Sequence, residues 1–450
     1  MMSDSVSLDS VSINQINDKL VVLLHGKELA DIVVIQGKAT LIYRSPIDKN
    51  FSISSSMPPR IESYSGYILE NWIWNLLPDS IQTLQWIARD TANGPKCSDR
   101  NPFRLIAKVG EECSGAIQIV RPDRVSLLNP GEINPLSVQD VELRLRGARR
   151  GKSPLGISTA EETGGYFSLA GAQPKLALRK IEEGWAAVSG AEPTSHILKP
   201  PMPDMEGQIE GEHFCLALAR LCGLPAASSE IVRFGEEVAI AVERFDRHKT
   251  SDGKLKRIHV EDMCQALGNH PRKKYQSDGG PCIADICRFL RQESHFPNVD
   301  VEIFFRACIF NWLIGGTDAH AKNYSVFVVG GKVILSPLYD INTYLPYTDR
   351  ISIGKLSMSV GKRYEFGAIC LRHWEREALK AGMPVGFDVA KAITEMAVKI
   401  RVGALPLAEG LAALSQYADR QILLNTAGLI IQRVETVIVS LQEEKRDTKC

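Results

Sequence analysis

The order of local patterns along the chain constrains its fold more than any other feature of the sequence. From Tyr166 to Arg247 strand patterns follow one another, among them KLALRK, WAAV, SHILK, SSEIVRF and VAIAVERF. One helical pattern, GEHFCLALARLCGL, interrupts them and ends at the stop signals Gly223 and Pro225. Beyond Arg247 the patterns are helical almost to the end of the chain. This order predicts an α+β protein in which a lobe of five strands and one helix precedes a helical lobe.

Length and composition narrow the class of protein. A chain of 450 residues suggests roughly two to four domains. The 53 Lys and Arg residues balance 53 Asp and Glu residues, so net charge does not direct the protein to nucleic acid or to an anionic membrane. The ten cysteines form no CxxC pair and no zinc-like pattern, which predicts a reducing cytoplasm. The start MMSDSVSLDSVSINQ is polar, so we expect that the protein is not secreted. No run of about 18 apolar residues is evident, so we expect that it does not span a membrane.

Patterning divides the chain into four expected segments. Strand patterns and the helical stretch YILENWIWNLLPDSIQTLQWIARDT form an N-terminal module that ends near a turn-rich region. The expected division is an N-terminal subdomain at 1–125, a connecting helix and linker at 126–165, the strand-rich lobe at 166–247 and the helical lobe at 248–450.

The expected linker segment carries the densest basic run of the chain. Its pattern favours a solvated helix face over a contact with an anion or nucleic acid. The run consists of Arg144, Arg146, Arg149, Arg150 and Lys152.

The stretch GGTDAHAKNYSVFVVGGKVILSPLYD contains the densest group of candidate site residues. Within it, YSVFVV and KVILS flank Gly330 and Gly331, which predicts a β-hairpin. A hairpin brings its two ends together, so Asn323 before the first strand and Asp340 after the second should share a corner. An amide oxygen and a carboxylate at one corner suit Mg²⁺, which keeps several waters and takes further ligands from substrate phosphates.

Asp318 precedes Asn323 by five residues, the spacing that protein kinases use between the catalytic Asp and a metal-binding Asn. Asp318 would then orient or deprotonate an incoming hydroxyl. The match is partial, because Gly316 and Thr317 replace the His-Arg pair of the kinase motif. A polar turn with a capping Asp explains the short motif equally well by itself, and the hairpin with Asp340 favours the kinase interpretation.

His320 lies inside this motif and has three open roles. It could contact substrate or phosphate, brace the loop as a hydrogen-bond donor, or be an ordinary core histidine. We prefer the bracing role.

The strand-rich lobe fits the same scheme. In FSLAGAQPK the strand breaks at Ala170-Gly171-Ala172, where backbone N–H groups could approach phosphate oxygens, although an ordinary hairpin explains the turn equally well. Lys199 ends the strand SHILK ahead of the helix that contains Glu212, and kinases place their phosphate-binding lysine and its glutamate partner in this order. Glu243 and Phe245 follow the last strand, where a kinase chain crosses between lobes. The alternative there is an exposed charge beside a core aromatic.

Together these segments resemble the HipA family, the toxin serine/threonine protein kinases of bacterial toxin–antitoxin systems. The resemblance rests on SLAGAQPKLAL, SHILK, GEHFCLALARLCGL, VERFDR, EDMCQALG, WLIGGTDAHAKNYSVF and LYDI, and in the N-terminal module on FSISSSMP, LLPDS and NPFRLIAKVGEECSGAI. It covers nearly the whole chain. It implies an α+β, two-lobed protein-kinase-like fold with an N-terminal α+β subdomain and an all-helical C-lobe.

The resemblance also implies roles for individual residues. Asp318 would be the catalytic Asp, and Asn323 and Asp340 would bind Mg²⁺. We count His320 among the catalytic residues for its bracing role in the loop. Ser168 matches the serine that family members autophosphorylate, which displaces the loop and switches the kinase off. The residues implied to bind ATP are Ala170, Gly171, Ala172, Gln173, Lys175, Lys199, Glu243 and Phe245.

The implied partners follow from the same resemblance. They are a small HipB-like helix-turn-helix antitoxin and a protein substrate, which in the family has included aminoacyl-tRNA synthetases. Operator DNA would be contacted only through the antitoxin.

The leading hypothesis is therefore a cytoplasmic Mg-ATP-dependent protein serine/threonine kinase that acts as a toxin. A small-molecule kinase of the antibiotic or lipid type is the second hypothesis, because such kinases also use Asp-x-His-x-x-Asn. A catalytically silent scaffold that binds an antitoxin and DNA is the third. Competent residues at each phosphoryl-transfer position argue against this third hypothesis.

Overall fold

The N-terminal part of the chain folds into a sheet with three helices. The computed structural model describes residues 16–447 except 49, 92–93, 150–167, 169–170, 172, 204, 348–353 and 416. The sheet is antiparallel in the order β4-β3-β2-β1-β5, and its core joins Leu20 and Val22 of the first strand to Trp72 and Ile73 of the first helix. The elements are β1 (Ile16–Leu24), β2 (Lys27–Ile35), β3 (Lys38–Tyr43), β4 (Tyr64–Ser65), β5 (Ile117–Val120), α1 (Tyr67–Leu76), α2 (Ile81–Arg89) and α3 (Pro102–Val109).

The next part is a six-stranded sheet in the order β10-β11-β9-β7-β8-β6. Helices cover both of its faces, since alternate residues of a strand point to opposite sides. Ala239 and Ala241 pack with α4, while Ile240 and Val242 pack with Ile209 of α5. The elements are β6 (Glu132–Leu136), α4 (Val138–Arg149), β7 (Leu176–Ile181), β8 (Gly184–Ser189), β9 (His196–Lys199), α5 (Gln208–Leu221), β10 (Ser229–Phe234) and β11 (Glu237–Glu243).

Two features of this lobe differ from the sequence interpretation. β6 falls in the segment expected as a connecting helix and linker, yet it pairs with β8 and extends the sheet. The basic run is not simply a solvated face, because Arg146 and Arg149 of α4 both form ion pairs with Glu237, at 3.4 and 2.8 Å. These pairs attach α4 to the start of β11. Arg150 and Lys152 lie outside the described residues.

The C-terminal part is mainly, but not wholly, helical. Its helices share one large core, and the predicted hairpin around Gly330 and Gly331 is present as β15–β16. This hairpin joins β14 in a three-stranded sheet, and β12–β13 and β17–β18 form two further small sheets, so the expectation of an all-helical C-lobe was too simple. The strands are β12 (Arg247–Lys249), β13 (Leu255–Arg257), β14 (Val260–Asp262), β15 (Ser325–Val329), β16 (Lys332–Leu335), β17 (Lys355–Val360) and β18 (Arg363–Glu365). The helices are α6 (Met263–Ala266), α7 (Ile283–Glu293), α8 (Pro297–Ile314), α9 (Leu371–Ala381), α10 (Val389–Leu414) and α11 (Arg420–Asp447).

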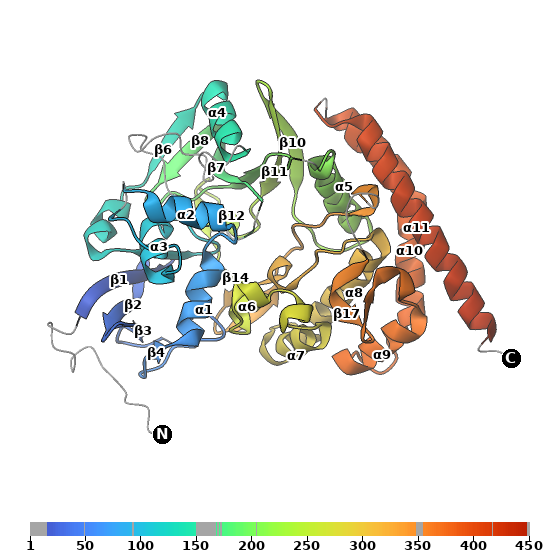
Figure 1. Ribbon diagram of the computed structural model, residues 1–450, viewed down its shortest axis with the longest axis horizontal. Coiled ribbons are helices and arrows are strands. Elements are labelled where there is room, and N and C mark those ends of the chain that lie inside the picture. The colour runs from blue at the N-terminus through green and yellow to red at the C-terminus, as the bar shows by residue number, and fades with distance from the viewer. Residues whose placement is uncertain are drawn as a thin grey trace.

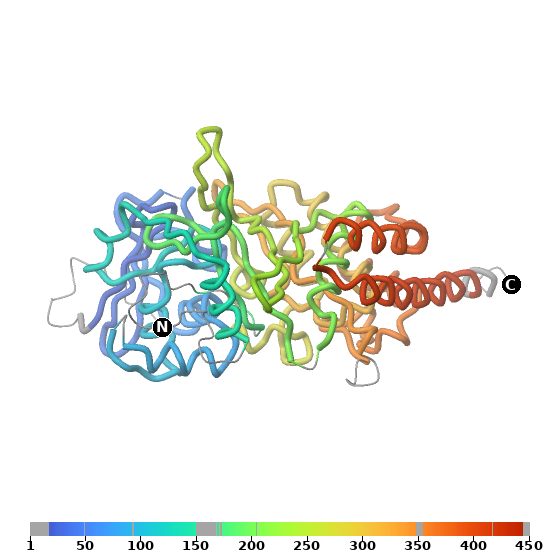
Figure 2. Tube along the Cα trace, turned by 90° about the horizontal axis from the view of Figure 1, so that it is seen from above, coloured from blue at the N-terminus to red at the C-terminus, as the bar shows by residue number. Residues whose placement is uncertain are grey.

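The N-terminal domain and the α10–α11 pair lie at opposite ends of the molecule. In Figure 1 the N-terminal domain occupies the left side, and α10 and α11 lie side by side at the right. Seen from above, the N-terminal sheet and the α10–α11 pair are at opposite ends of the long axis (Figure 2). In Figure 1, β10, β11 and α5 of the strand-rich lobe lie between them, and β6, β8 and α4 lie above the N-terminal domain.

α11 is apolar enough to pass a composition test for a membrane span. An 18-residue window within Arg420–Glu443 has a mean hydropathy of 1.5. However, Leu423, Ile430, Val434 and Leu441 are buried in the C-terminal core. This face of α11 packs against protein, and 33% of the apolar window is buried.

Candidate functional site

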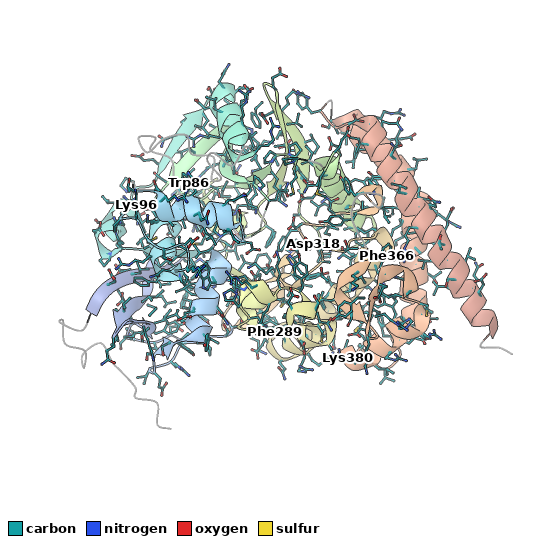
Figure 3. The ribbon with its side chains drawn as sticks, viewed as in Figure 1. Trp86, Lys96, Phe289, Asp318, Phe366 and Lys380 are labelled. Carbon is teal, nitrogen blue, oxygen red and sulfur yellow. The ribbon has the colours of Figure 1, made fainter. Side chains whose placement is uncertain are left out.

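A cavity of about 360 Å³ opens where the three parts meet, a common location for ligand sites. The N-terminal domain contributes Asn75 and Ser114 to its wall. Asp318 lies near the middle of the molecule in Figure 3, between the N-terminal domain and the C-terminal helices. The predicted site residues that line the cavity are Gly171, Gln173, Lys175, Lys199, Glu212, Glu243, Phe245, Asp318, His320, Asn323 and Asp340.

Lys199 connects the two lobes at this cavity. Its Nζ lies 2.7 Å from Oε1 of Glu212 on α5 and 2.7 Å from Oδ1 of Asp340. The sequence predicted a lysine at the end of a strand and a glutamate partner on the following helix. In the structure these two residues, Lys199 and Glu212, form an ion pair. Two acceptors leave one of the three ammonium donors for a further anion.

The charges around Lys199 shift each other's protonation. Burial lowers the pKa of the Lys199 ammonium, but Asp340 and Glu212 outweigh it and hold that pKa above its usual value. Burial raises the pKa of the Asp340 carboxyl, yet Lys199 outweighs this and lowers it to about 2. Glu212 is more enclosed, so burial raises the pKa of its carboxyl despite Lys199. Asp340 is accordingly ionised at neutral pH.

Asp340 lies just beyond the β15–β16 hairpin, as the turn predicted. Its backbone has φ 56°, a left-handed conformation that is uncommon outside glycine and tends to occur at functional sites. Its side chain is 44% exposed although it stands among the cavity residues. The carboxylate is therefore open to a ligand in the cavity.

Asn323 and Asp318 are held together within the loop. The Asn323 side-chain Nδ2 donates to the backbone oxygen of Asp318 at 2.9 Å, which leaves the amide oxygen as the atom available to a metal. Tyr275 donates its hydroxyl to Oδ1 of Asp318 at 2.8 Å, which leaves Oδ2 for a substrate hydroxyl. Burial is the main cause that raises the pKa of the Asp318 carboxyl, and a raised pKa makes a carboxylate a better base.

His320 is neutral at this site. It is 5% exposed, and burial together with Lys274 lowers the pKa of its imidazole to about 3. Its Nδ1 has no hydrogen-bond partner among the described residues, and its ring lies edge-on to Tyr275 at 5.1 Å. The predicted bracing role of His320 therefore has no hydrogen bond from Nδ1 to support it. The contact of its ring with Tyr275 points to packing instead.

The donor set fits Mg²⁺ bound together with a nucleotide. Among the described residues, no three His, Cys, Asp or Glu side chains cluster as a self-contained metal centre. One carboxylate, Asp340, and one amide oxygen, Asn323, at a cavity wall are the donors expected when phosphates complete the shell. Mg²⁺ would neutralise phosphate charge there.

The expected phosphate loop is only partly described, since Ala170 and Ala172 lie outside the described residues. Gly171 has φ 109°, and a Cβ added to it would lie 2.6 Å from the Nζ of Lys175. Burial, then Lys199, lowers the pKa of the Lys175 ammonium to about 8. Gln173 donates to the backbone oxygen of Pro200 at 3.1 Å. The side-chain amines of Lys175 and Lys199 therefore line the same cavity, which suits a polyanionic ligand.

Glu243 and Phe245 both line the cavity at the crossing between lobes. Glu243 is exposed at the end of β11, and the Phe245 ring packs against Tyr339 with centroids 5.3 Å apart. These positions fit both interpretations of Glu243 and Phe245: a hinge, where the chain crosses between the lobes, and an exposed charge beside a core aromatic.

Ser168 is placed differently from the sequence expectation. It belongs to no strand and is fully buried. Its hydroxyl donates to the backbone oxygen of Leu76, at the end of α1, at 2.6 Å, and its N–H donates to the backbone oxygen of Glu112 at 2.7 Å. In this arrangement the hydroxyl is directed to the N-terminal domain and does not line the cavity.

Sequence reasoning missed the contacts that the N-terminal domain makes here. Lys322, inside the DAHAKN motif, bonds Asn75 and Asp262, and Lys274 forms an ion pair with Asp79 at 3.2 Å. The partners lie far away in sequence, so no local pattern reveals them. The one signal was the lysine itself, placed between two site residues.

A second missed feature is a cluster of charged side chains around Glu112 and Asp246, next to the hinge at Glu243 and Phe245. Glu112 of the N-terminal domain forms ion pairs with three arginines, and Asp246 forms ion pairs with two of them. The arginines are Arg244, Arg247 and Arg257. The cluster joins the N-terminal domain to the segment between the lobes.

Comparison with known families matches both halves of this architecture. The HipA N-terminal domain matches residues 20–120, and the HipA-like C-terminal domain matches residues 167–403. The second match alone covers more than half of the chain. The protein belongs to the HipA family. This membership confirms the α+β, kinase-like fold predicted from the sequence, and it identifies a kinase of the HipA type.

Individual HipA relatives agree with this assignment. Y4mE of Sinorhizobium fredii, which its name assigns to the kinases, is 34% identical over 75% of this chain and 78% of its own. The serine/threonine-protein kinase toxin HipA of Shewanella oneidensis is 29% identical over 66% of this chain and 68% of its own. The structure of Shewanella oneidensis HipA with HipB and operator DNA has a TM-score of 0.79, at 23% identity, over 94% of this chain and 98% of that one. The two chains share one fold.

Proposed function

We propose that this chain is a Mg-ATP-dependent protein serine/threonine kinase and the toxin of a type II toxin–antitoxin system. One observation carries the proposal: Lys199 pairs with Glu212 and Asp340 at a cavity that also contains Asp318 and Asn323. Lysine, glutamate, two aspartates and an asparagine in these positions are the parts that kinases use for phosphoryl transfer.

In the proposed reaction Asp318 accepts the proton of the acceptor hydroxyl, whose oxygen bonds to the γ-phosphorus as the bond to ADP breaks. Tyr275 holds one oxygen of Asp318 and leaves the other for that proton. The Lys199 ammonium is placed to contact the nucleotide phosphates, and Asn323 and Asp340 would hold Mg²⁺ against them. Bound Mg²⁺ would offset the charge of the transferring group.

The proposed partners are a HipB-like helix-turn-helix antitoxin and a protein substrate in the translation machinery, such as an aminoacyl-tRNA synthetase. The structural relative in complex with HipB and operator DNA supports the first, and DNA would be reached through the antitoxin. We place the protein in the cytoplasm and propose Ser168 as its autophosphorylation site. We keep the proposed boundaries at 125 and 247, and we assign β6 and α4 of the segment 126–165 to the strand-rich lobe.

The test is to incubate the purified chain with Mg-ATP and a bacterial lysate depleted of nucleotides, and to map new phosphosites by mass spectrometry. We expect modified serine or threonine in the chain and in a translation protein. Asp318→Asn is the matched control, since it keeps the volume of the side chain and removes the base. Labelled phosphate that appears only on small molecules would favour the small-molecule kinase hypothesis, and no transfer at all would favour the silent scaffold.

A further inference from the structure

Lys322 is an ammonium group enclosed within the catalytic loop. It lies in the short helix η6 (Ala321–Asn323) and is 5% exposed. Its Nζ contacts Asn75 Oδ1 at 2.8 Å, Asn75 O at 3.3 Å and Asp262 Oδ2 at 2.7 Å. Asn75 belongs to α1 of the N-terminal domain, so this side chain crosses from the loop to another domain.

All three ammonium donors of Lys322 are engaged. A lysine has three N–H donors, and the three acceptors above use them. Lys199, by contrast, has two carboxylate partners at the same cavity and keeps one donor. Lys322 lies between the site residues His320 and Asn323 in the sequence. Its hydrogen bonds nevertheless suit a positioning role rather than phosphate binding.

Both anchors of Lys322 are themselves fixed. Asn75 donates its Nδ2 to the backbone oxygens of Asn71 and Asn269, at 2.9 and 2.7 Å. Asp262 uses its other oxygen to cap α6, accepting from the N–H groups of Cys264 and Gln265. A side chain held between two rigid anchors holds its own backbone in place.

A second contact from the same end of α1 reaches the loop indirectly. Asp79, three residues beyond α1, forms an ion pair with Lys274. The next residue, Tyr275, donates to Asp318. The segment Asn75–Asp79 therefore supports the catalytic loop through Lys322 and through the Lys274–Tyr275 segment.

We propose that Lys322 is a positioning residue through which α1 of the N-terminal domain sets the geometry of the Asp318–Asn323 loop. On this inference the N-terminal domain is part of the catalytic apparatus as well as an appended module. The inference rests on the proposed kinase function for its effect on turnover. Its effect on loop order is independent of that function.

The experiment compares four forms of the full-length chain: wild type, Lys322→Met, Asn75→Ala and the double variant. Lys322→Met removes the charge and keeps much of the chain length, and Asn75→Ala removes one acceptor from another domain. We expect each to lower turnover at saturating ATP by at least about tenfold, because small misplacement of catalytic groups is costly. ATP affinity should stay within about twofold, since a loss confined to turnover marks the transition state. The double variant should be no slower than Lys322→Met.

Asn71→Ala is the matched control. Asn71 lies on the same helix and donates to the backbone oxygen of Gly268 in the C-terminal part at 2.9 Å, but this bond does not involve the catalytic loop. We expect Asn71→Ala to keep wild-type turnover even if its melting temperature falls. Hydrogen exchange of residues 318–324 should be faster in Lys322→Met and Asn75→Ala and unchanged in Asn71→Ala.

Several outcomes would overturn the inference. Wild-type turnover in folded Lys322→Met would do so, and a loss of ATP affinity without a loss of turnover would make Lys322 a nucleotide contact. An equal loss in Asn71→Ala would mean that domain docking alone matters. If Lys322→Met does not fold, Asn75→Ala still decides, because it leaves Lys322 paired with Asp262. If the wild type transfers no phosphate, the proposed function fails, and unchanged exchange at 318–324 would separately refute the positioning role.

Discussion

The hydroxyl of Tyr275 donates a hydrogen bond of 2.8 Å to Oδ1 of Asp318, so one oxygen of this carboxylate is already engaged by the protein. In the proposed reaction, the second oxygen accepts the proton of the substrate hydroxyl. Because burial raises the pKa of Asp318, the base form is less favoured in acid than for an ordinary aspartate.

The first prediction concerns this carboxylate. Asp318→Asn should lower phosphoryl transfer at least about a hundredfold, the usual scale for the loss of general-base catalysis. ATP affinity and melting temperature should change little, because Lys199, Glu212 and Asp340 remain. Single-turnover assays together with calorimetry measure both quantities. Substantial turnover in the variant would rule out Asp318 as the base.

The second prediction concerns the metal. Asp340→Asn keeps the shape of the side chain but removes its charge, so it should weaken ATP binding in the presence of Mg²⁺ more than in its absence. Titration calorimetry with Mg²⁺ and with EDTA measures the difference. An equal loss in both conditions would show that Asp340 acts only through its ion pair with Lys199.

The third prediction concerns Ser168. Its hydroxyl faces the carbonyl at the end of α1, where a helix carries partial negative charge, and a phosphate adds about −1.5 to −2 charges at neutral pH. The phosphorylated residue should therefore leave this position, and the phosphoprotein should not bind ATP. Ser168→Ala should bind ATP normally, and modification should require Asp318. Tight ATP binding by fully phosphorylated protein would contradict this switch.

The fourth prediction concerns the cluster of charged side chains around Glu112 and Asp246. Glu112→Gln leaves the buried Arg244 and Arg247 with one carboxylate, Asp246, and removes the ion pair of the partly buried Arg257. Breaking a buried ion pair typically costs about 3–5 kcal/mol. Burial raises the pKa of Glu112, but the three arginines outweigh it and hold that pKa well below its usual value. Because the pKa of Glu112 is lower in the folded protein than in the unfolded chain, ionised Glu112 stabilises the fold at pH values above its pKa in the unfolded chain. This contribution is lost as pH falls below about 4. Urea unfolding at neutral pH and at low pH measures the effect.

Glu111→Gln is the control for that substitution, because Glu111 pairs with the more exposed Arg124. Surface pairs contribute about 0–1 kcal/mol. Equal destabilisation by both substitutions would contradict the special role of the cluster.

The fifth prediction concerns Glu261 in β14. Its carboxylate is buried and accepts hydrogen bonds from Ser54 and Ser55 of the N-terminal domain, and burial raises its pKa to about 7. The folded state then binds more protons than the unfolded state between about pH 4.3 and pH 7, so stability falls as pH rises through this window. Glu261→Gln should remove this slope and exceed wild-type stability at pH 8 by up to about 3 kcal/mol. A stability difference that does not change from pH 5 to pH 8 would exclude the titration.

Local patterns predicted those parts of the site that one segment encodes. Gly330 and Gly331 specify a two-residue turn, and the turn specifies that Asn323 and Asp340 approach the same cavity. The Lys199–Glu212 ion pair could also be predicted from the sequence, because a strand and the helix that follows it can approach each other in few ways.

Other parts depend on contacts between distant segments and could not be predicted in this way. β6 contains Pro135 and no apolar alternation, so only its pairing with β8 makes it a strand. Lys322 and Asn75 are 247 residues apart. Ser168 was expected in the strand that leads into the Ala170-Gly171-Ala172 turn, and its bond to Leu76 is a contact with another domain that no pattern near Ser168 encodes.

The Glu112 cluster has a consequence for the order of events during protein synthesis. Glu112 leaves the ribosome first, and Arg244 follows 132 residues later. At about 5–20 residues per second, the carboxylate waits roughly 7 to 30 s for its partners. An unpaired carboxylate is costly to bury, so this surface of the nascent N-terminal domain stays hydrated until the arginines emerge. The paired form of this domain interface can therefore exist only after Arg244, Arg247 and Arg257 have been synthesised.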